Sequence, residues 1–103
     1  MIVKDNKVYS FKMNSGEEIV ALVVKTAHDL DRTWYEVEAP LGTMPSAQGV
    51  QLIPAMFSID HNGNASIYTS SVAMISLPRE DMLNAYREST TGIKVPDKKI
   101  LLS

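Results

Sequence analysis

Residues 59–76, with the sequence IDHNGNASIYTSSVAMIS, place a polar step between two strand-like segments. Asn62-Gly63 is typical of a two-residue type I′ hairpin turn, because both residue types tolerate a positive φ. An isoleucine–tyrosine pair then favours a strand, three small hydroxyl side chains follow at 69–71, and an apolar run at 72–75 favours a strand again. The sequence therefore predicts a hairpin whose second strand is interrupted and then resumed.

The composition indicates one globular domain that covers residues 1–103. Hydrophobic residues make up 45% of the chain and charged residues 21%, which is typical of a folded protein. No apolar run approaches the roughly 20 residues of a membrane-spanning helix, and the first residues lack the layout of a signal peptide. The absence of cysteine excludes a disulfide framework and a thiolate metal site. We expect a cytoplasmic protein without a membrane partner.

The distribution of charge restricts what the middle of the chain can bind. The net charge is −2, so no global positive field attracts nucleic acid. All the lysines and arginines lie outside the segment between Arg32 and Arg79. Residues 33–78 therefore contact any partner without a basic side chain of their own.

Short apolar segments at close spacing predict a small antiparallel β-fold. Residues 28–32 are expected to form a polar connection, and residues 40–49, rich in Gly, Pro, Ser and Ala, a long loop. Pro54 cannot donate a ladder hydrogen bond, so we expect a bulge or an exposed edge there. The expected strands, which together form a β-barrel or sandwich over residues 8–76, are 8–13, 19–24, 34–39, 50–59, 65–69 and 72–75.

One helix is predicted after the strands, at about residues 78–91. Pro78 suits its start, and Glu80 and Asp81 are acidic residues in the first turn, where the helix dipole favours them. Gly92 suits the position just after the helix. The tail, residues 94–103, is expected either to dock as a strand or to remain a flexible peptide. The apolar stripe of the helix consists of Met82, Leu83 and Tyr86.

The residue types offer little for catalysis. Both histidines lie in predicted turns beside aspartates, which are metal-ligand types but in turns more often bond their own backbone. Ser70-Ser71 has no nearby base or nucleophile-elbow pattern. Trp34 and several methionines would suit a soft binding surface, although packing in a core or interface is their more common role. We therefore expect no enzyme, no metal site and no cofactor. The residues weighed as metal ligands are His28, Asp29, Asp31, Asp60 and His61.

Two segments resemble the motifs of Sm-like proteins, the superfamily that includes bacterial Hfq. MNSGEEIVALVV, residues 13–24, is similar to the first Sm motif, with Gly16 at its turn and Ala21 where the family usually has a second glycine. IYTSSVAMIS, residues 67–76, is similar to the second motif, and its Tyr-Thr-Ser-Ser stands where Hfq has Tyr-Lys-His-Ala. The whole chain resembles the diverged Sm-like proteins of phages that infect marine bacteria, the cyanophages among them.

The resemblance implies a mostly β fold: a small, strongly bent antiparallel Sm-like barrel of five to six strands, followed here by a C-terminal helix. In the family, the fourth strand pairs with the fifth strand of a neighbouring subunit, and repeated pairing closes a ring. Such pairing would cover the bare edge of an apolar last strand. The hydroxyl step would then be the bend by which one strand leaves its own sheet and the next reaches the neighbour. The implied subunit-interface residues are Ile67, Tyr68, Val72, Ala73, Met74 and Ile75.

The resemblance also implies single-stranded RNA as a partner. In the family, uridine-rich or adenine-rich RNA binds the loop after the second strand and the turn between the fourth and fifth strands. Tyr68 would stack on a base, while neighbouring hydroxyls and Asp31 would hydrogen-bond its edge. The residues aligned with this site are His28, Asp29, Asp31, Arg32, Tyr68, Thr69, Ser70 and Ser71.

Three departures from the family pattern leave two functions open. The helix follows the barrel instead of preceding it, the loop at 42–49 is an insertion, and the second motif lacks its usual cation. Because phosphate neutralisation contributes much of the affinity for RNA, the missing cation argues for weak binding or another face. The first hypothesis is a homo-oligomeric ring that acts as an RNA chaperone. The alternative is an oligomeric scaffold or protein-interaction ring without RNA.

Overall fold

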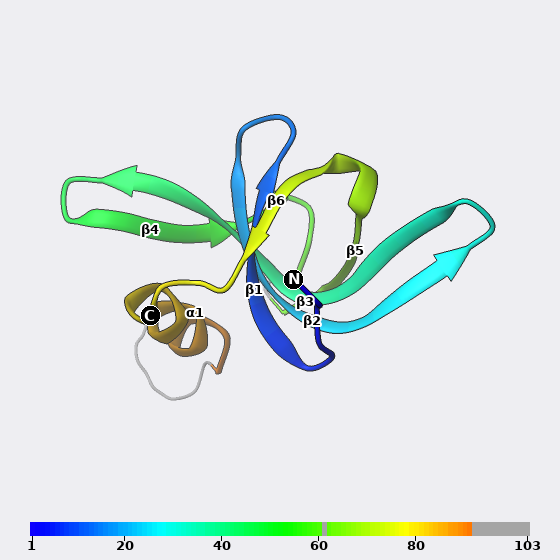
Figure 1. The fold of residues 1–103 in the computed structure, drawn as a ribbon. Helices are drawn as coiled ribbons and strands as arrows, with labels where there is room; N and C mark the ends of the chain where they lie inside the picture. The colour runs from blue at the N-terminus through cyan, green and yellow to red at the C-terminus, as the bar shows by residue number, and fades with distance from the viewer. Residues whose placement is uncertain (61, 92–103) are drawn as a thin grey trace.

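The structure, a computed structural model, describes residues 1–60 and 62–91. The predicted fold class is confirmed: the chain is mostly β, with a six-stranded antiparallel sheet and one C-terminal helix (Figure 1). The sheet is not closed, because its strands run in the order β4-β3-β2-β1-β6, with β5 paired to β3 beside this path. The elements are β1 (Lys7–Met13), β2 (Glu18–Asp29), β3 (Arg32–Ser46), β4 (Gly49–Pro54), β5 (Asn64–Tyr68), the 3₁₀ turn η1 (Thr69–Ser71), β6 (Val72–Ser76) and α1 (Glu80–Thr91).

The long strand β3 organises the sheet because it has two successive partners on one edge. β5 pairs with its first part, from Trp34 to Glu38, and β4 pairs with its second part, from Leu41 to Ser46. Between them Ala39 has a φ of 49°, a left-handed value that interrupts the extended backbone. The ends of the β2–β3 and β3–β4 hairpins consequently project in opposite directions from the centre (Figure 1), and the molecule measures 45 × 26 × 25 Å.

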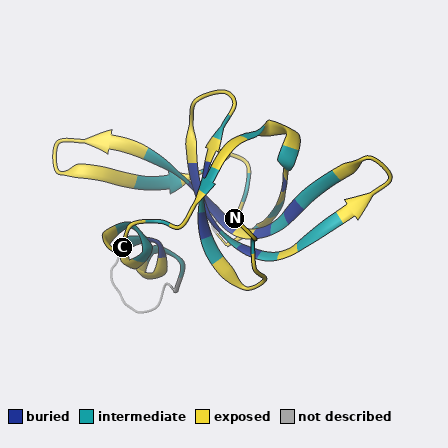
Figure 2. Cartoon of the chain, viewed as in Figure 1, coloured by how far each residue is buried: buried dark blue, intermediate teal, exposed yellow. Residues whose placement is uncertain are grey.

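Strand β2 is buried on both faces where it crosses the centre, which explains its continuous apolar sequence. Ile19, Ala21 and Val23 face a core between the strands, together with Phe11 of β1. Val20 lies on the opposite face, in a second cluster with the helix. Figure 2 shows the buried residues concentrated at this crossing, while the hairpin ends are exposed.

Tyr86 fastens helix α1 to a bulge between β2 and β3. Val20 pairs with Leu41 but Leu22 pairs with Glu38, so one residue of β2 lies opposite two residues of β3. The Tyr86 hydroxyl accepts a hydrogen bond from the Leu22 N–H at 3.0 Å and donates one to the Glu38 carbonyl at 2.9 Å. The side chain thus bridges the two strands where their own pairing is irregular.

Two predicted connections are strands in the structure. The expected polar connection at 28–32 is reduced to a turn between Asp29 and Arg32, which are themselves paired. The expected loop at 40–49 is mostly strand, because β3 continues through Pro40 and pairs with β4. Both predictions assigned polar or Gly- and Pro-rich segments to loops. In the structure these segments lie in hairpins that project into solvent, where strands accept such residues.

The hairpin predicted at Asn62-Gly63 is also absent. The fourth strand ends at Pro54 instead of residue 59, and β4 and β5 each pair with β3 instead of with each other. Pro54 does lie in an edge strand, as expected. The Gly63 N–H donates to the Asp60 carbonyl, so the Asn-Gly pair turns the chain within a longer connection.

The remaining elements agree with the sequence. β1 has Tyr9 and Phe11 buried on one face, and η1 forms the predicted bend between two short strands. Gly16 has a φ of 102° in the turn after β1, where glycine is favoured. The predictions for His61, Gly92 and the tail 94–103 lie outside the described residues.

Candidate functional site

Pairing between β3 and β5 brings the two predicted site segments together. Trp34 lies directly opposite Tyr68, the last residue of β5. The next residue, Thr69, donates from its hydroxyl to the Thr33 carbonyl at 3.0 Å. Segments more than 30 residues apart in the sequence therefore form one surface at the start of β3.

Three side chains on this surface form a cation–aromatic cluster, which we call the Trp34 cluster: Arg32, Trp34 and Tyr68. The Arg32 guanidinium carbon lies 5.5 Å from the Tyr68 ring centroid, within the range of a cation–π contact. The Trp34 and Tyr68 ring centroids lie 5.7 Å apart at 50°, a tilted arrangement that aromatic pairs favour. Tyr68 remains 39% exposed, so its ring is accessible to a ligand.

Glu36 holds the Trp34 ring from the same strand face. Its carboxylate accepts a hydrogen bond from Trp34 Nε1 at 2.8 Å and another from Ser66 Oγ at 3.1 Å. These hydrogen bonds, from Trp34 first and Ser66 second, lower the pKa of the Glu36 carboxyl, and the charge of Lys25 adds to the effect. The cluster is therefore bordered by an ionised carboxylate.

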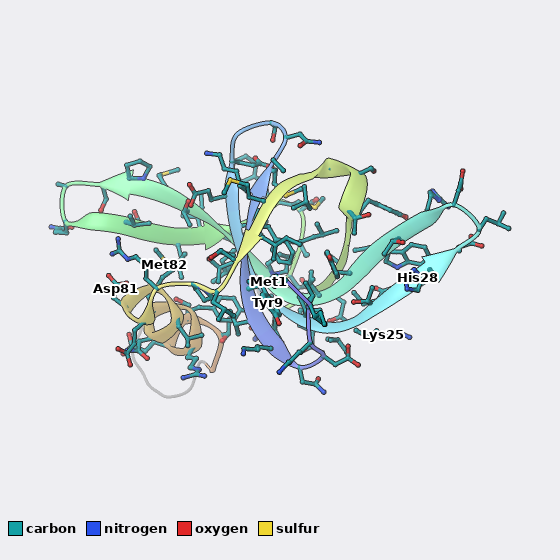
Figure 3. The ribbon with its side chains drawn as sticks, in the orientation of Figure 1. Met1, Tyr9, Lys25, His28, Asp81 and Met82 are labelled. Carbon is teal, nitrogen blue, oxygen red and sulfur yellow. The ribbon has the colours of Figure 1, made fainter. Side chains whose placement is uncertain are left out.

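The predicted residues of the β2–β3 hairpin do not all share this surface. Asp29 pairs with Arg32 and lies on the same face, but His28 pairs with Thr33 on the other face. His28 Nδ1 lies 3.0 Å from the Thr33 hydroxyl oxygen. Figure 3 places His28 far out along the hairpin, beyond Lys25. Asp31 belongs to the exposed turn at the tip.

Ser70 and Ser71 contact the turn after β1 through their backbone. The Asn14 side-chain amide donates to the Ser70 carbonyl at 2.9 Å, and the Asn14 N–H donates to the Ser71 carbonyl at 2.8 Å. Both serines are exposed. Of the eight predicted residues, only Arg32 and Tyr68 thus belong to the Trp34 cluster. Thr69 supports it from η1 through its hydrogen bond to the Thr33 carbonyl.

The sequence prediction did not assign Trp34, Glu36 or Ser66 to the site, although it considered Trp34 for a soft binding surface. Trp34 and Glu36 follow Arg32 at intervals of two, which places all three on one strand face. Ser66 joins them only because it pairs with Glu36 across β5. The alternation was readable from the sequence, whereas the register between β3 and β5 was not.

The predicted interface strands each have one partner among the described residues. β5 pairs with β3, and β6 pairs with β1, so the other edge of each strand is open within residues 1–60 and 62–91. Ile67 is buried in the core, and Val72 and Ile75 pack against it. Ala73 and Met74 are exposed on β6.

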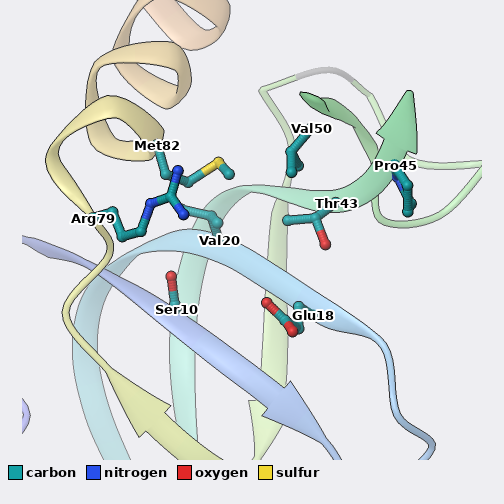
Figure 4. Close-up of a pocket in the computed structure, with 8 residues that line it drawn as sticks. All are labelled: Ser10, Glu18, Val20, Thr43, Pro45, Val50, Arg79 and Met82. Carbon is teal, nitrogen blue, oxygen red and sulfur yellow. The ribbon is translucent and has the colours of Figure 1, made fainter. Parts of the chain in front are cut away.

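A concave region beside the start of the helix (Figure 4) is lined by none of the residues of the Trp34 cluster. It has a volume of about 310 Å³ and lies between the start of α1, β2 and the β3–β4 hairpin. Its arginine, Arg79, is paired with Asp81, and its carboxylate, Glu18, lies 3.7 Å from Lys12. The residues that line it are Ser10, Glu18, Val20, Thr43, Pro45, Val50, Arg79 and Met82.

Within the described part of the chain, no three His, Asp or Glu side chains gather as metal ligands would. No helix in that part is long and apolar enough to cross a membrane. No protein-family model matches the chain, and no curated protein is significantly similar to it.

Proposed function

We propose that this chain is the subunit of an Sm-like ring and that the Trp34 cluster binds single-stranded RNA. The observation that carries the proposal is the contact of Arg32, Trp34 and Tyr68 on one exposed surface, at the two segments that the resemblance assigns to RNA. Aromatic rings stack on bases, and an arginine beside them supplies positive charge and a further stacking plane.

The strand order supports the ring. β6 extends the sheet beyond β1, β5 lies on β3, and the short turn η1 connects them. The open edges of β5 and β6 therefore belong to opposite sides of one chain, and pairing β5 with β6 of a neighbour satisfies both. Such contacts are head-to-tail, and in the proposed assembly the rotation between successive copies closes them into a ring.

Titration of short labelled RNA at two salt concentrations tests RNA binding. We expect uridine-rich or adenine-rich oligomers to bind at micromolar concentrations or tighter, with affinity that falls as salt rises. Tyr68→Ala removes a stacking ring and should weaken binding by about tenfold or more, since a base–aromatic stack contributes about 1–3 kcal/mol. Lys7→Gln, an exposed cation on β1, is the matched control and should have a much smaller effect.

A scaffold ring without RNA is the second candidate, because carboxylates surround the cluster. Asp29 lies opposite Arg32 in the backbone register of the hairpin. Glu36 and Glu38 follow on the same strand face as Trp34. These charges repel phosphate. A chain that assembles into a ring but binds no RNA at low salt would establish this candidate and contradict RNA binding.

A further inference from the structure

The Trp34 indole N–H is held by the Glu36 carboxylate, a group that only accepts hydrogen bonds. Both Glu36 carboxylate oxygens already accept one hydrogen bond each, from Trp34 and from Ser66. An ionised carboxylate has about four lone-pair sites and no donor, so each oxygen has room for one more donor. Glu36 is partly exposed, which leaves these sites open to a ligand.

Nucleobases differ in what they present to such a carboxylate. Guanine offers two adjacent N–H donors, from N1 and N2, that match the two oxygens of a carboxylate. Uracil offers one N–H between two carbonyl oxygens, which the carboxylate repels. A base stacked on Trp34 or Tyr68 would bring its Watson–Crick edge to this region, since single-stranded bases are read on that edge.

We propose that Glu36 is a specificity-determining residue that makes the Trp34 cluster prefer guanine over uracil. The proposal rests on the proposed RNA binding and adds the base that is recognised. Glu36 fixes the indole through Trp34 Nε1 and accepts from the guanine edge with its remaining lone pairs. The same carboxylate disfavours phosphate, so the backbone of the RNA lies toward Arg32.

The tryptophan itself is the probe, because Trp34 is the single tryptophan of the chain. Quenching of its fluorescence is measured with the RNA pentamers UUGUU and UUUUU, whose single central difference avoids guanine-rich aggregates. We expect UUGUU to bind about tenfold more tightly, the size of discrimination that a bidentate base contact gives.

The variant Glu36→Gln separates base recognition from folding. Glutamine has the same shape, and it can still accept from Trp34 and donate to Ser66, but it replaces one acceptor by a donor. The ratio of the two affinities should fall to about one. Glu38→Gln, two residues further on the same strand face, is the control and should keep the native ratio.

The outcomes are distinguishable. If neither pentamer quenches Trp34, RNA binding at this cluster fails and the guanine preference fails with it. If UUUUU binds as tightly as UUGUU to the native chain, the preference is wrong although RNA binding stands. Retention of the native ratio in Glu36→Gln would likewise overturn the role of Glu36.

Discussion

Tyr86 shows how one hydroxyl can repair an irregular sheet. A bulge leaves backbone groups without their ladder partners, and buried unpaired groups are costly. The Tyr86 hydroxyl accepts from Leu22 and donates to Glu38, which uses both of its hydrogen-bonding capacities. The ring also fills the second apolar cluster, so a single residue couples the helix to the bend.

Removing that hydroxyl should destabilise the fold. Tyr86→Phe keeps the ring but leaves the Leu22 N–H and the Glu38 carbonyl unpaired. We expect the free energy of unfolding to fall by about 1–2 kcal/mol, in the lower part of the cost of an unsatisfied buried group, because both backbone groups are only partly buried. Urea unfolding followed by circular dichroism measures it. Tyr68→Phe, at an exposed ring, should change stability by less than about 0.5 kcal/mol, and an equal loss in both variants would contradict the role of the bulge.

Burial of the Tyr86 hydroxyl also makes the stability of the fold depend on pH in the alkaline range. Desolvation raises the pKa of its hydroxyl from 10.0 to about 12 in the folded protein. The folded state therefore holds this proton more tightly than the unfolded state, and its contribution is complete below pH 10. Stability should fall as pH rises from about 10 to 12, by about 2–3 kcal/mol.

Urea midpoints at several pH values in this range provide the measurement. The informative quantity is the difference between the native chain and Tyr86→Phe, because it isolates the contribution of the Tyr86 hydroxyl. That difference should shrink as pH rises, and a constant difference would contradict the shifted pKa.

At the scale of elements, the β2–β3 hairpin has an unfavourable residue at its turn. Leu30 has a φ of 51° and a fully exposed side chain, at 101% of its reference area. A left-handed backbone costs a leucine roughly 1–2 kcal/mol, and the exposed side chain gains no packing in return. Asparagine tolerates this conformation better.

Leu30→Asn should therefore stabilise the protein. We expect the free energy of unfolding to rise by about 0.5–1 kcal/mol, because the strain is reduced and no buried contact is lost. Thermal unfolding gives the direction of the change directly. Leu30→Val is the opposing control, since a β-branched residue suits a positive φ least, and a variant order of Val above Asn would refute the explanation.

Among the strands and the helix, the sequence could predict those that depend on local preferences. Alternation and capping residues identified β1, the interrupted strands on either side of η1, and the helix, because these depend on local preferences. The continuation of β3 through Pro40 and the separation of β4 from β5 could not be read. They depend on which part of the same edge of β3 each strand occupies, a long-range choice that Asn62-Gly63 does not encode.

The residues of the candidate site likewise divide into those that local sequence could identify and those that depend on long-range strand pairing. Arg32 and Tyr68 were identified through the resemblance of their segments, and Thr69 with them. Glu36 and Ser66 entered only when the register of β3 against β5 was known. His28 was misplaced relative to the others because one step along a strand moves a side chain to the opposite face.

At the scale of the whole molecule, the two open edges make assembly testable. Ala73 is exposed on β6, whose outer edge would pair with a neighbour in the proposed ring. A lysine on an edge strand opposes strand addition. Ala73→Lys should therefore reduce the mass of the native assembly in sedimentation or light scattering. Ala47→Lys makes the same change at the exposed tip of the β3–β4 hairpin and should leave the mass unchanged. A native chain that sediments as a monomer would contradict the ring.

The bridge from Tyr86 to the bulge also has a consequence for local opening of the folded protein. The Leu22 N–H donates to the Tyr86 hydroxyl, so exchange of this amide hydrogen with water requires helix α1 to move away from the sheet. The protection of one amide in β2 would thus report how often the helix detaches while the sheet stays folded.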